Sequence, residues 1–292
     1  MRIAITGSSG LVGSALVPLL NAAGNSVVRV SRPADWNPDQ DTIDSSVLNG
    51  VEAVVNLSGE NIAAGRWTAA QKSRIRESRV RSTKLISETL AKLDRPPRVL
   101  VSASATGYYG DRGSEVLRED SAPGEGFLPD VCRQWEAATS PATHAGIRVV
   151  HMRTGLVLSG KGGAMGKMLL PFKLGLGGRI GSGRQYWSWI SLDDLCSAIV
   201  HCVQAGSLHG PVNMVSPSPV TNLEFTKTLG RVLSRPAVFP MPAFAARIAL
   251  GQMADELLLA SARVEPVKLT ASRFVFRHRD LEPTLRNYFN AV

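Results

Sequence analysis

Cysteines are few in this sequence and form no recognisable pair. Its 292 residues include only three, Cys132, Cys196 and Cys202, and no two of them stand in a C-x-x-C arrangement. The five histidines are likewise scattered, without the spacing that metal ligands show. We therefore expect no bound metal and no disulfide scaffold, and the low cysteine content favours a reducing compartment.

Long apolar runs are also missing. No stretch approaches the roughly 18 residues that a membrane-spanning helix requires. The first residues form a short apolar segment instead of a charged region followed by a cleavage site. We expect no signal peptide, no membrane partner and a cytoplasmic location.

Acidic residues are outnumbered by basic ones, 24 against 33, so the formal net charge is +9. A charge of this sign favours nucleic acid, a membrane surface or an anionic small ligand as the partner. The densest basic stretch, residues 66–98, has neither interleaved aromatic residues nor a known nucleic-acid-binding motif. We interpret it as a solvated helix face and expect a small-molecule substrate, with nucleic acid as the less favoured alternative. The sequence does not indicate an oligomeric state.

A strand, a glycine-rich turn and a helix follow one another at the beginning of the chain. Arg2–Thr6 is a short apolar run, and Gly7, Gly10 and Gly13 come after it at G-x-x-G-x-x-G spacing. Residues 14–23 then have helical character. In the Rossmann fold this arrangement brings backbone N–H groups and a helix N-terminus to a pyrophosphate. The pattern predicts a dinucleotide-binding site.

The residue after the second predicted strand indicates which dinucleotide is bound. Residues 26–30 form that strand, and Arg32 follows at its carboxyl end, where this architecture meets the adenosine ribose. A guanidinium there can bind a 2′-phosphate by charge-assisted hydrogen bonds, which favours NADP over NAD. Asp35 lies close in sequence and keeps open the alternative that Arg32 is an ordinary loop residue.

Strands alternate with helices through the first half of the chain. Further buried strands are predicted at 51–57, 98–102 and 147–152, with helices at 68–93 and 130–139 between them. This alternation is typical of an α/β fold with a doubly wound parallel sheet of the Rossmann type.

After the fifth strand the alternation stops. We expect residues 1–158, together with 188–212, to form the dinucleotide-binding Rossmann domain. Residues 213–292, with 159–187, are expected to form a smaller α+β C-terminal lobe that covers the substrate. Phe274–Phe276 has the pattern of a strand in this lobe.

Four motifs occur in the order in which a known family carries them: Thr6-Gly-x-x-Gly-x-x-Gly13, Arg79-Val-x-Ser-Thr83, Ser102-Ala-Ser104 and Arg153-Thr-Gly155. With them the chain resembles an extended short-chain dehydrogenase/reductase of the sugar-nucleotide epimerase type. Narrower signatures resemble the atypical epimerase branch that contains the bacterial YfcH-like proteins; they include Asn56-Leu-Ser-Gly-Glu-Asn-Ile62, Tyr108-Tyr-Gly110, Trp135-Glu136 and Phe172-Lys-Leu-Gly-Leu-Gly-Gly178. The likeness extends from the first strand to Arg279.

The resemblance implies a Rossmann domain that binds NADP or NADPH. It implies that Arg32 contacts the ribose phosphate and that the phosphate turn comprises Gly7, Ser8, Ser9, Gly10, Leu11 and Val12. It also implies a wall on the nicotinamide side made of Leu57, Ser58, Gly59, Arg79, Ser102 and Thr154. Ser104 matches the serine that hydrogen-bonds a substrate oxygen in the family.

One departure from the wider family concerns proton transfer. Ordinary members use a Tyr-x-x-x-Lys pair, in which the lysine lowers the tyrosine pKa so that the phenol can exchange a proton with the substrate. The matching helix here carries Leu128 and Cys132 at those positions, and neither can take over that role. Tyr108 and Tyr109, just beyond Ser104, are the candidate proton carriers, and packing beside the cofactor is the alternative for both.

Two functions follow from these residues. The first is an NADP-dependent oxidoreductase or epimerase-like enzyme that acts by hydride transfer on a carbonyl or sugar-nucleotide-like substrate. The alternative is a catalytically weak NADP-binding protein that serves as a redox sensor or scaffold. Arg153 either meets a phosphate or carboxylate of the substrate or forms an ion pair with Glu60 or Asp193.

Overall fold

The computed structural model describes residues 1–289, which pack into two compact units. Unit 1 comprises Met1–Ala105, Asp130–Arg153 and Cys196–Val212, and unit 2 comprises Thr106–Pro129, Thr154–Leu195 and the chain from Asn213 onward. The packing therefore puts residues 106–129, 154–158 and 188–195 in unit 2, whereas the sequence analysis grouped them with the Rossmann domain. The division into a cofactor domain and a substrate lobe stays a prediction.

Within residues 1–289, unit 1 is built on a six-stranded sheet with the strand order β12-β8-β6-β5-β1-β2. The strands are β1 (Arg2–Thr6), β2 (Ser26–Val30), β5 (Ala53–Asn56), β6 (Val99–Ala105), β8 (Arg148–Thr154) and β12 (Gly210–Met214). β1 pairs in parallel with both β2 and β5, and β5 pairs in parallel with β6. The predicted α/β fold of the Rossmann type is confirmed.

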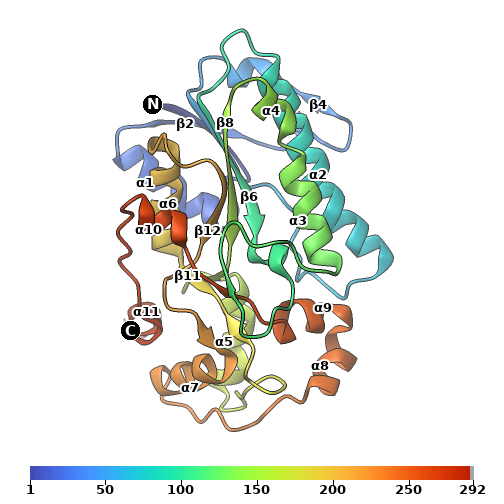
Figure 1. The fold of residues 1–292 in the computed structure, drawn as a ribbon, viewed down its shortest axis with the longest axis vertical. Helices are drawn as coiled ribbons and strands as arrows, with labels where there is room; N and C mark the ends of the chain where they lie inside the picture. The colour runs from blue at the N-terminus through green and yellow to red at the C-terminus, as the bar shows by residue number, and fades with distance from the viewer. Residues whose placement is uncertain (290–292) are drawn as a thin grey trace. The chain divides into compact units, whose positions relative to one another are not determined.

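Helices lie on both sides of this sheet (Figure 1). They are α1 (Leu11–Ala22), α2 (Ala69–Ala91), α3 (Phe127–Ala137), α4 (Ser140–His144) and α6 (Leu192–Gln204). On one face, side chains of α2 and α4 pack with those of β1, β5, β6 and β8 in an apolar cluster that includes Ala4, Val54, Ile86, Leu100 and Ala142. A small hairpin of β3 (Trp36–Asn37) and β4 (Thr42–Ile43), followed by the 3-10 turn η1 (Ser45–Leu48), contributes Trp36 and Leu48 to that cluster.

The order of the strands fixes where a ligand can bind. The chain adds β2 on one side of β1 and then crosses to add β5 on the other side. Loops from β1 and β5 consequently leave the sheet in opposite directions, and their carboxyl ends form the crevice in which α/β folds bind nucleotides. Gly7 follows β1 at this point, and Leu57 follows β5.

Unit 2 consists of short strand pairs and helices around its own core. Its strands are β7 (Val116–Leu117), β9 (Leu156–Leu158), β10 (Tyr186–Trp187), β11 (Trp189–Ser191), β13 (Val220–Thr221) and β14 (Arg263–Val264). Its helical segments are η2 (Thr106–Tyr109), α5 (Ala164–Lys173), α7 (Asn222–Val232), α8 (Ala243–Leu250), α9 (Gln252–Ala254), η3 (Asp255–Leu259), α10 (Val267–Ala271) and α11 (Leu281–Phe289). The core joins Phe172, Trp189, Phe225 and Leu285 from four of these elements.

One expectation about unit 2 needs correction. Phe274–Phe276 is not a strand, because among residues 1–289 no strand pairs with it, although its side chains alternate: the rings of Phe274 and Phe276 meet edge to face at 4.8 Å and Val275 is exposed. The glycine-dense segment 159–183 contains the helix α5. Met165 and Phe172 are buried in the core of unit 2, and this burial outweighs the low helix propensity of the local sequence.

In the described part of the chain, no helix has the length and apolar character needed to cross a bilayer.

Candidate functional site

The glycine-rich turn between β1 and α1 is fixed by two close backbone approaches. Gly7 has φ +67°, and a Cβ atom there would lie 2.8 Å from the carbonyl oxygen of Leu57. A Cβ atom at Gly13 would overlap the carbonyl oxygen of Gly7 and the Cα of Ser8. Side chains at these two positions are therefore excluded by the fold itself, in agreement with the roles that the fingerprint gives to its glycines.

The N-terminus of α1 is prepared for an anion. Gly10 occupies the N-cap position in an extended conformation, and among the described residues no side chain caps this end and no acidic residue lies in the first turn. Backbone N–H groups at an uncapped helix start attract anionic oxygens, aided by the helix dipole. Ser9 and Gly10 are exposed, Leu11 and Val12 are half-buried, and Ser8 is buried. The turn thus fits a pyrophosphate.

Arg32 lies exposed just beyond the carboxyl end of β2. Its guanidinium carbon stands 5.1 Å from the ring centroid of Trp36, which holds the side chain against the β3–β4 hairpin. The carboxylate of Asp35 accepts a 2.7 Å hydrogen bond from the backbone N–H of Ser31, so it caps this turn. The surroundings of Arg32 fit an anionic ligand, because stacking on an aromatic ring leaves guanidinium N–H groups to reach a phosphate.

A buried polar network joins the carboxyl ends of β1 and β5 to the middle of β6. The side chain of Asn56 accepts a 2.7 Å hydrogen bond from the Thr6 hydroxyl and donates to the hydroxyls of Thr83 (2.9 Å) and Ser102 (3.4 Å). The indole N–H of Trp135 donates to the same Thr83 hydroxyl at 2.9 Å. Asn56 lies one residue before the end of the predicted strand 51–57, and no role was expected for it. The network holds β1, β5, β6 and α2 in register below the crevice, and Ser102 belongs to it.

Arg79 supports the loop after β5. Its guanidinium donates hydrogen bonds to the carbonyl oxygens of Ile75 (3.0 Å) and Glu60 (2.9 Å) and lies 5.1 Å from the ring centroid of Trp135. A Cβ atom on Gly59 would lie 3.3 Å from this guanidinium, so the loop sits directly on Arg79. Burial lowers the pKa of Arg79 from its usual value. This geometry makes Arg79 a residue that positions Leu57, Ser58 and Gly59.

Ser104 and Arg153 share one carboxylate. The Ser104 hydroxyl donates a 2.7 Å hydrogen bond to Oε1 of Glu136, and Arg153 binds both oxygens of Glu136 at 2.9 Å. All three side chains are largely buried, and the carboxylate of Glu136 is only 11% exposed. The predicted partners of Arg153, Glu60 or Asp193, are therefore wrong, because α3 brings Glu136 closer. Since its proton points to Glu136, the Ser104 oxygen offers its lone pairs to a ligand.

Helix α3 carries Leu128 and Cys132, the two residues that the resemblance matches to the Tyr-x-x-x-Lys pair. Leu128 and Cys132 are both buried. The Cys132 thiol faces the Ala105 carbonyl oxygen at 3.8 Å, and burial raises its pKa to about 12. A thiol with such a pKa stays protonated near neutral pH and is a poor nucleophile.

The two candidate tyrosines differ in their surroundings within unit 2. Tyr109 is completely buried, and its hydroxyl lies 2.7 Å from Oδ1 of Asn213 and 2.9 Å from the carbonyl oxygen of Arg118. Tyr108 is half-buried and meets the Tyr109 ring edge to face, with centroids 5.4 Å apart. Such burial argues against proton exchange between Tyr109 and a substrate, so Tyr108 is the remaining candidate.

Thr154, predicted for the nicotinamide side, is half-buried at the end of β8.

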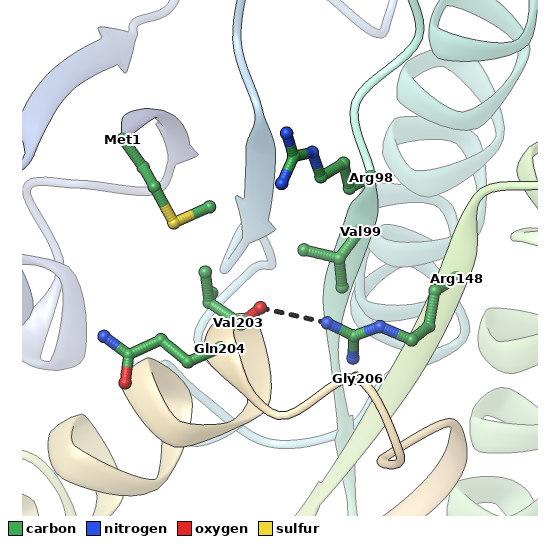
Figure 2. Close-up of a pocket in the computed structure, with 7 residues that line it drawn as sticks. All are labelled: Met1, Arg98, Val99, Arg148, Val203, Gln204 and Gly206. Carbon is green, nitrogen blue, oxygen red and sulfur yellow. Dashed lines mark hydrogen bonds between the residues drawn. The ribbon is translucent and has the colours of Figure 1, made fainter.

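A cavity of about 390 Å³ lies at the opposite end of the sheet in unit 1 (Figure 2). Met1, Arg98 and Arg148 at its wall stand at the amino ends of β1, β6 and β8, away from the crevice. The Arg148 guanidinium donates to the carbonyl oxygens of Cys202, Val203 and Leu208 at 2.7–2.9 Å and so caps the last turn of α6. Because its guanidinium is bound to three backbone carbonyl oxygens, Arg148 has a structural role at this cavity.

The fold and the glycine-rich turn together define a Rossmann-type α/β protein with a nucleotide-binding crevice. The chain belongs to the NAD dependent epimerase/dehydratase family, whose model matches residues 3–214. A second model, a domain of unknown function (DUF1731), matches residues 241–288 in unit 2.

Relatives are similar over almost the whole chain. An epimerase family protein of Mycobacterium bovis is 45% identical over 290 residues, which cover 97% of this chain and 96% of the relative. The crystal structure of the human epimerase family protein SDR39U1 with NADPH has a TM-score of 0.92, 35% identity and 100% coverage of both chains. A UDP-glucose 4-epimerase of Thermotoga maritima with UDP-glucose, at 16% identity, covers 99% of both chains with a TM-score of 0.77 and so shares the fold.

Proposed function

We propose that this protein binds NADP(H) and acts as an oxidoreductase or epimerase-like enzyme by hydride transfer on a small carbonyl or sugar-nucleotide-like substrate. The observation that carries the cofactor assignment is the exposed Arg32 just beyond the carboxyl end of β2. This strand pairs in parallel with β1, whose carboxyl end leads to the uncapped N-terminus of α1. A human relative that was crystallised with NADPH supports the same assignment.

The residues of unit 1 that would hold the dinucleotide fall into two groups. The turn from Gly7 to Val12 would bind the pyrophosphate through backbone N–H groups, and Arg32 would bind the 2′-phosphate. Leu57, Ser58 and Gly59 would line the nicotinamide end, with Arg79 and Ser102 holding that wall from below. When bound, the cofactor supplies a nicotinamide that accepts or gives up a hydride.

Ser104 is the proposed substrate-positioning residue. Because the Ser104 hydroxyl donates its hydrogen bond to Glu136, the Ser104 oxygen can accept a hydrogen bond from a substrate hydroxyl. Arg153 holds Glu136 in place through hydrogen bonds to both of its carboxylate oxygens, so the orientation of Ser104 is maintained. This arrangement favours an alcohol or hydrated carbonyl as the group next to Ser104.

The cofactor assignment predicts a selective effect of Arg32→Asp. Loss of a charge-assisted hydrogen bond and introduction of a negative charge should weaken NADPH binding about 10- to 100-fold. Binding of NADH should change little, because it carries no 2′-phosphate. Titration of both cofactors by fluorescence measures the two affinities, and Arg29→Asp, at another exposed position on β2, is the matched control. Equal losses for both cofactors would count against the assignment.

The proton carrier is tested by Tyr108→Phe. We expect turnover of a carbonyl or sugar-nucleotide substrate, found by screening nicotinamide absorbance, to fall about 100-fold, in the range of general acid–base catalysis. Tyr109→Phe serves as the control, since its buried hydroxyl contributes to stability and is not expected to exchange a proton with substrate. Unchanged turnover of Tyr108→Phe would remove this tyrosine from the mechanism.

A catalytically weak NADP-binding sensor or scaffold remains the second candidate function. The buried Leu128 and the Cys132 thiol with its raised pKa on α3 favour it, because Leu128 has no proton to exchange and a protonated thiol cannot lower the pKa of a tyrosine. The two functions separate experimentally. NADPH binding without turnover of any screened substrate would support the sensor, and lack of NADPH binding would refute both functions.

A further inference from the structure

Unit 2 exposes a group of large apolar side chains on two adjacent segments. We call this group the apolar face; its members are Leu170, Leu174, Leu176, Val238, Phe239, Met241, Phe244 and Ile248. Their exposed fractions range from 43% for Met241 to 70% for Val238 and Ile248. Scattered single apolar residues on a surface need no explanation, but a concentration of this kind marks an interaction site.

Backbone hydrogen bonds bring the two segments together. The N–H of Phe239 donates to the carbonyl oxygen of Gly177 at 3.1 Å, and the N–H of Met241 donates to Arg179 at 2.9 Å. Gly181 donates in turn to the Met241 carbonyl oxygen at 2.8 Å. Residues 174–181 and 236–243 therefore lie side by side as a fixed surface.

Short helices extend this surface at both ends. Leu170 in α5 and Leu174 directly after it are four residues apart, so they share one side of the helix. In α8, Phe244 and Ile248 have the same spacing and are exposed, whereas Ala246 is buried against unit 2. Both helices thus direct an apolar edge outward while their other side belongs to the core.

The charge on these two segments is of one sign. Between Thr154 and Leu192 the sequence has no acidic residue, and the same is true between Phe225 and Ala254. The basic residues of the two segments are Lys161, Lys167, Lys173, Arg179, Arg184, Lys227, Arg231, Arg235 and Arg247. Acidic side chains from outside these segments meet some of them, since Asp255 pairs with Arg247 at 2.8 Å and Glu282 pairs with Arg231 at 2.8 Å. Lys173, Arg179 and Arg235 are exposed and lie within or next to the segments that carry the apolar face, so these segments are cationic.

We propose that the apolar face docks on the surface of an anionic phospholipid bilayer, with its aliphatic and aromatic side chains at the headgroup boundary and its lysines and arginines on the phosphates. Apolar side chains surrounded by basic residues are the combination that binds such surfaces. A second copy of the chain fits this face less well, because two faces of the same positive charge would repel each other. The lack of a long apolar run in the sequence favoured no membrane partner, but docking on a membrane surface requires no spanning segment.

Co-sedimentation of the full-length chain with lipid vesicles tests the proposal. We expect binding to phosphatidylcholine vesicles that contain phosphatidylglycerol, little binding to phosphatidylcholine alone, and release as salt is raised, since salt screens the attraction. Phe244→Ser combined with Ile248→Ser should weaken binding at least about tenfold. Lys173→Gln should weaken it about fivefold, as expected for one cation near such a surface.

Matched controls keep the test decisive. Val267→Ser combined with Val275→Ser changes two exposed apolar residues outside the apolar face, and Lys92→Gln removes an exposed cation in unit 1; neither should alter vesicle binding. Thermal unfolding verifies that every variant is folded. Absence of binding to anionic vesicles, or equal binding by the Phe244/Ile248 variant and the wild type, would overturn the proposal. So would a dimer, detected by light scattering, that the same variant converts to a monomer, because the face would then serve a second copy.

Discussion

Replacement of Gly13 by valine is expected to abolish detectable NADPH binding at micromolar cofactor. The first carbon of any side chain at this position would overlap the Gly7 carbonyl oxygen and the Cα of Ser8. The glycine-rich turn must then open away from α1, and the N–H groups that would bind the pyrophosphate lose their common direction. We expect an affinity loss on the order of 100-fold or more, the equivalent of about 2.7 kcal/mol.

Gly206→Ala provides the control for this substitution. Gly206 lies in the same unit after α6, and a Cβ atom there has no neighbour within 4 Å. Its NADPH affinity should equal that of the wild type, measured by the same fluorescence titration. Circular dichroism shows whether the Gly13 variant is folded. A folded Gly13→Val protein that binds NADPH with unchanged affinity would contradict the placement of the pyrophosphate on this turn.

Removal of the Glu136 carboxylate is expected to lower the free energy of unfolding more than any other substitution proposed for this protein. In Glu136→Ala the guanidinium of Arg153, which is 3% exposed, loses the counter-charge that it binds through two hydrogen bonds. Breaking a buried ion pair from one side costs about 3–5 kcal/mol, because the remaining charge stays in a poorly solvated place. The Ser104 hydroxyl loses its acceptor in the same step. Urea unfolding of the wild type and the variant measures the difference.

Asp130→Ala on the same helix is the matched control. Asp130 also pairs with arginines, Arg76 at 2.9 Å and Arg133 at 3.2 Å, but its side chain is 34% exposed and those of the two arginines are 42% and 54% exposed. Exposed ion pairs contribute about 0–1 kcal/mol, so this variant should remain close to the wild type. Similar losses for the two variants would show that Glu136 has no special structural role.

The fold of unit 1 could be predicted from the sequence to a large extent. The strands at Arg2–Thr6 and Ser26–Val30 were predicted with their observed bounds, because short apolar runs between turn residues are a local property. The family assignment, made from motifs of a few residues each, is confirmed by the model that matches residues 3–214. The strand bounds and the family motifs depend on residues that are close in sequence, and so sequence patterns predict them.

Other parts could not be predicted because they depend on contacts between distant residues. The helix α5 forms in a glycine-dense segment, since Met165 and Phe172 find partners in α7 and α11 that lie far along the chain. Arg153 binds Glu136, which sequence proximity did not single out against Glu60 and Asp193. Tyr108 and Tyr109 are adjacent, and nothing in the sequence distinguishes them, but only Tyr109 is completely buried in the structure.

By itself, the sequence determined the parallel α/β architecture and the phosphate-binding turn, and through Arg32 it predicted the kind of dinucleotide. These follow from local rules for strands, glycine turns and charge. The tertiary structure decided that Ser104 donates to Glu136 and that apolar residues 170–176 and 238–248 form one exposed, cation-rich face. Burial and hydrogen-bond partners depend on which distant segments the closed chain brings together, and no local pattern specifies that choice.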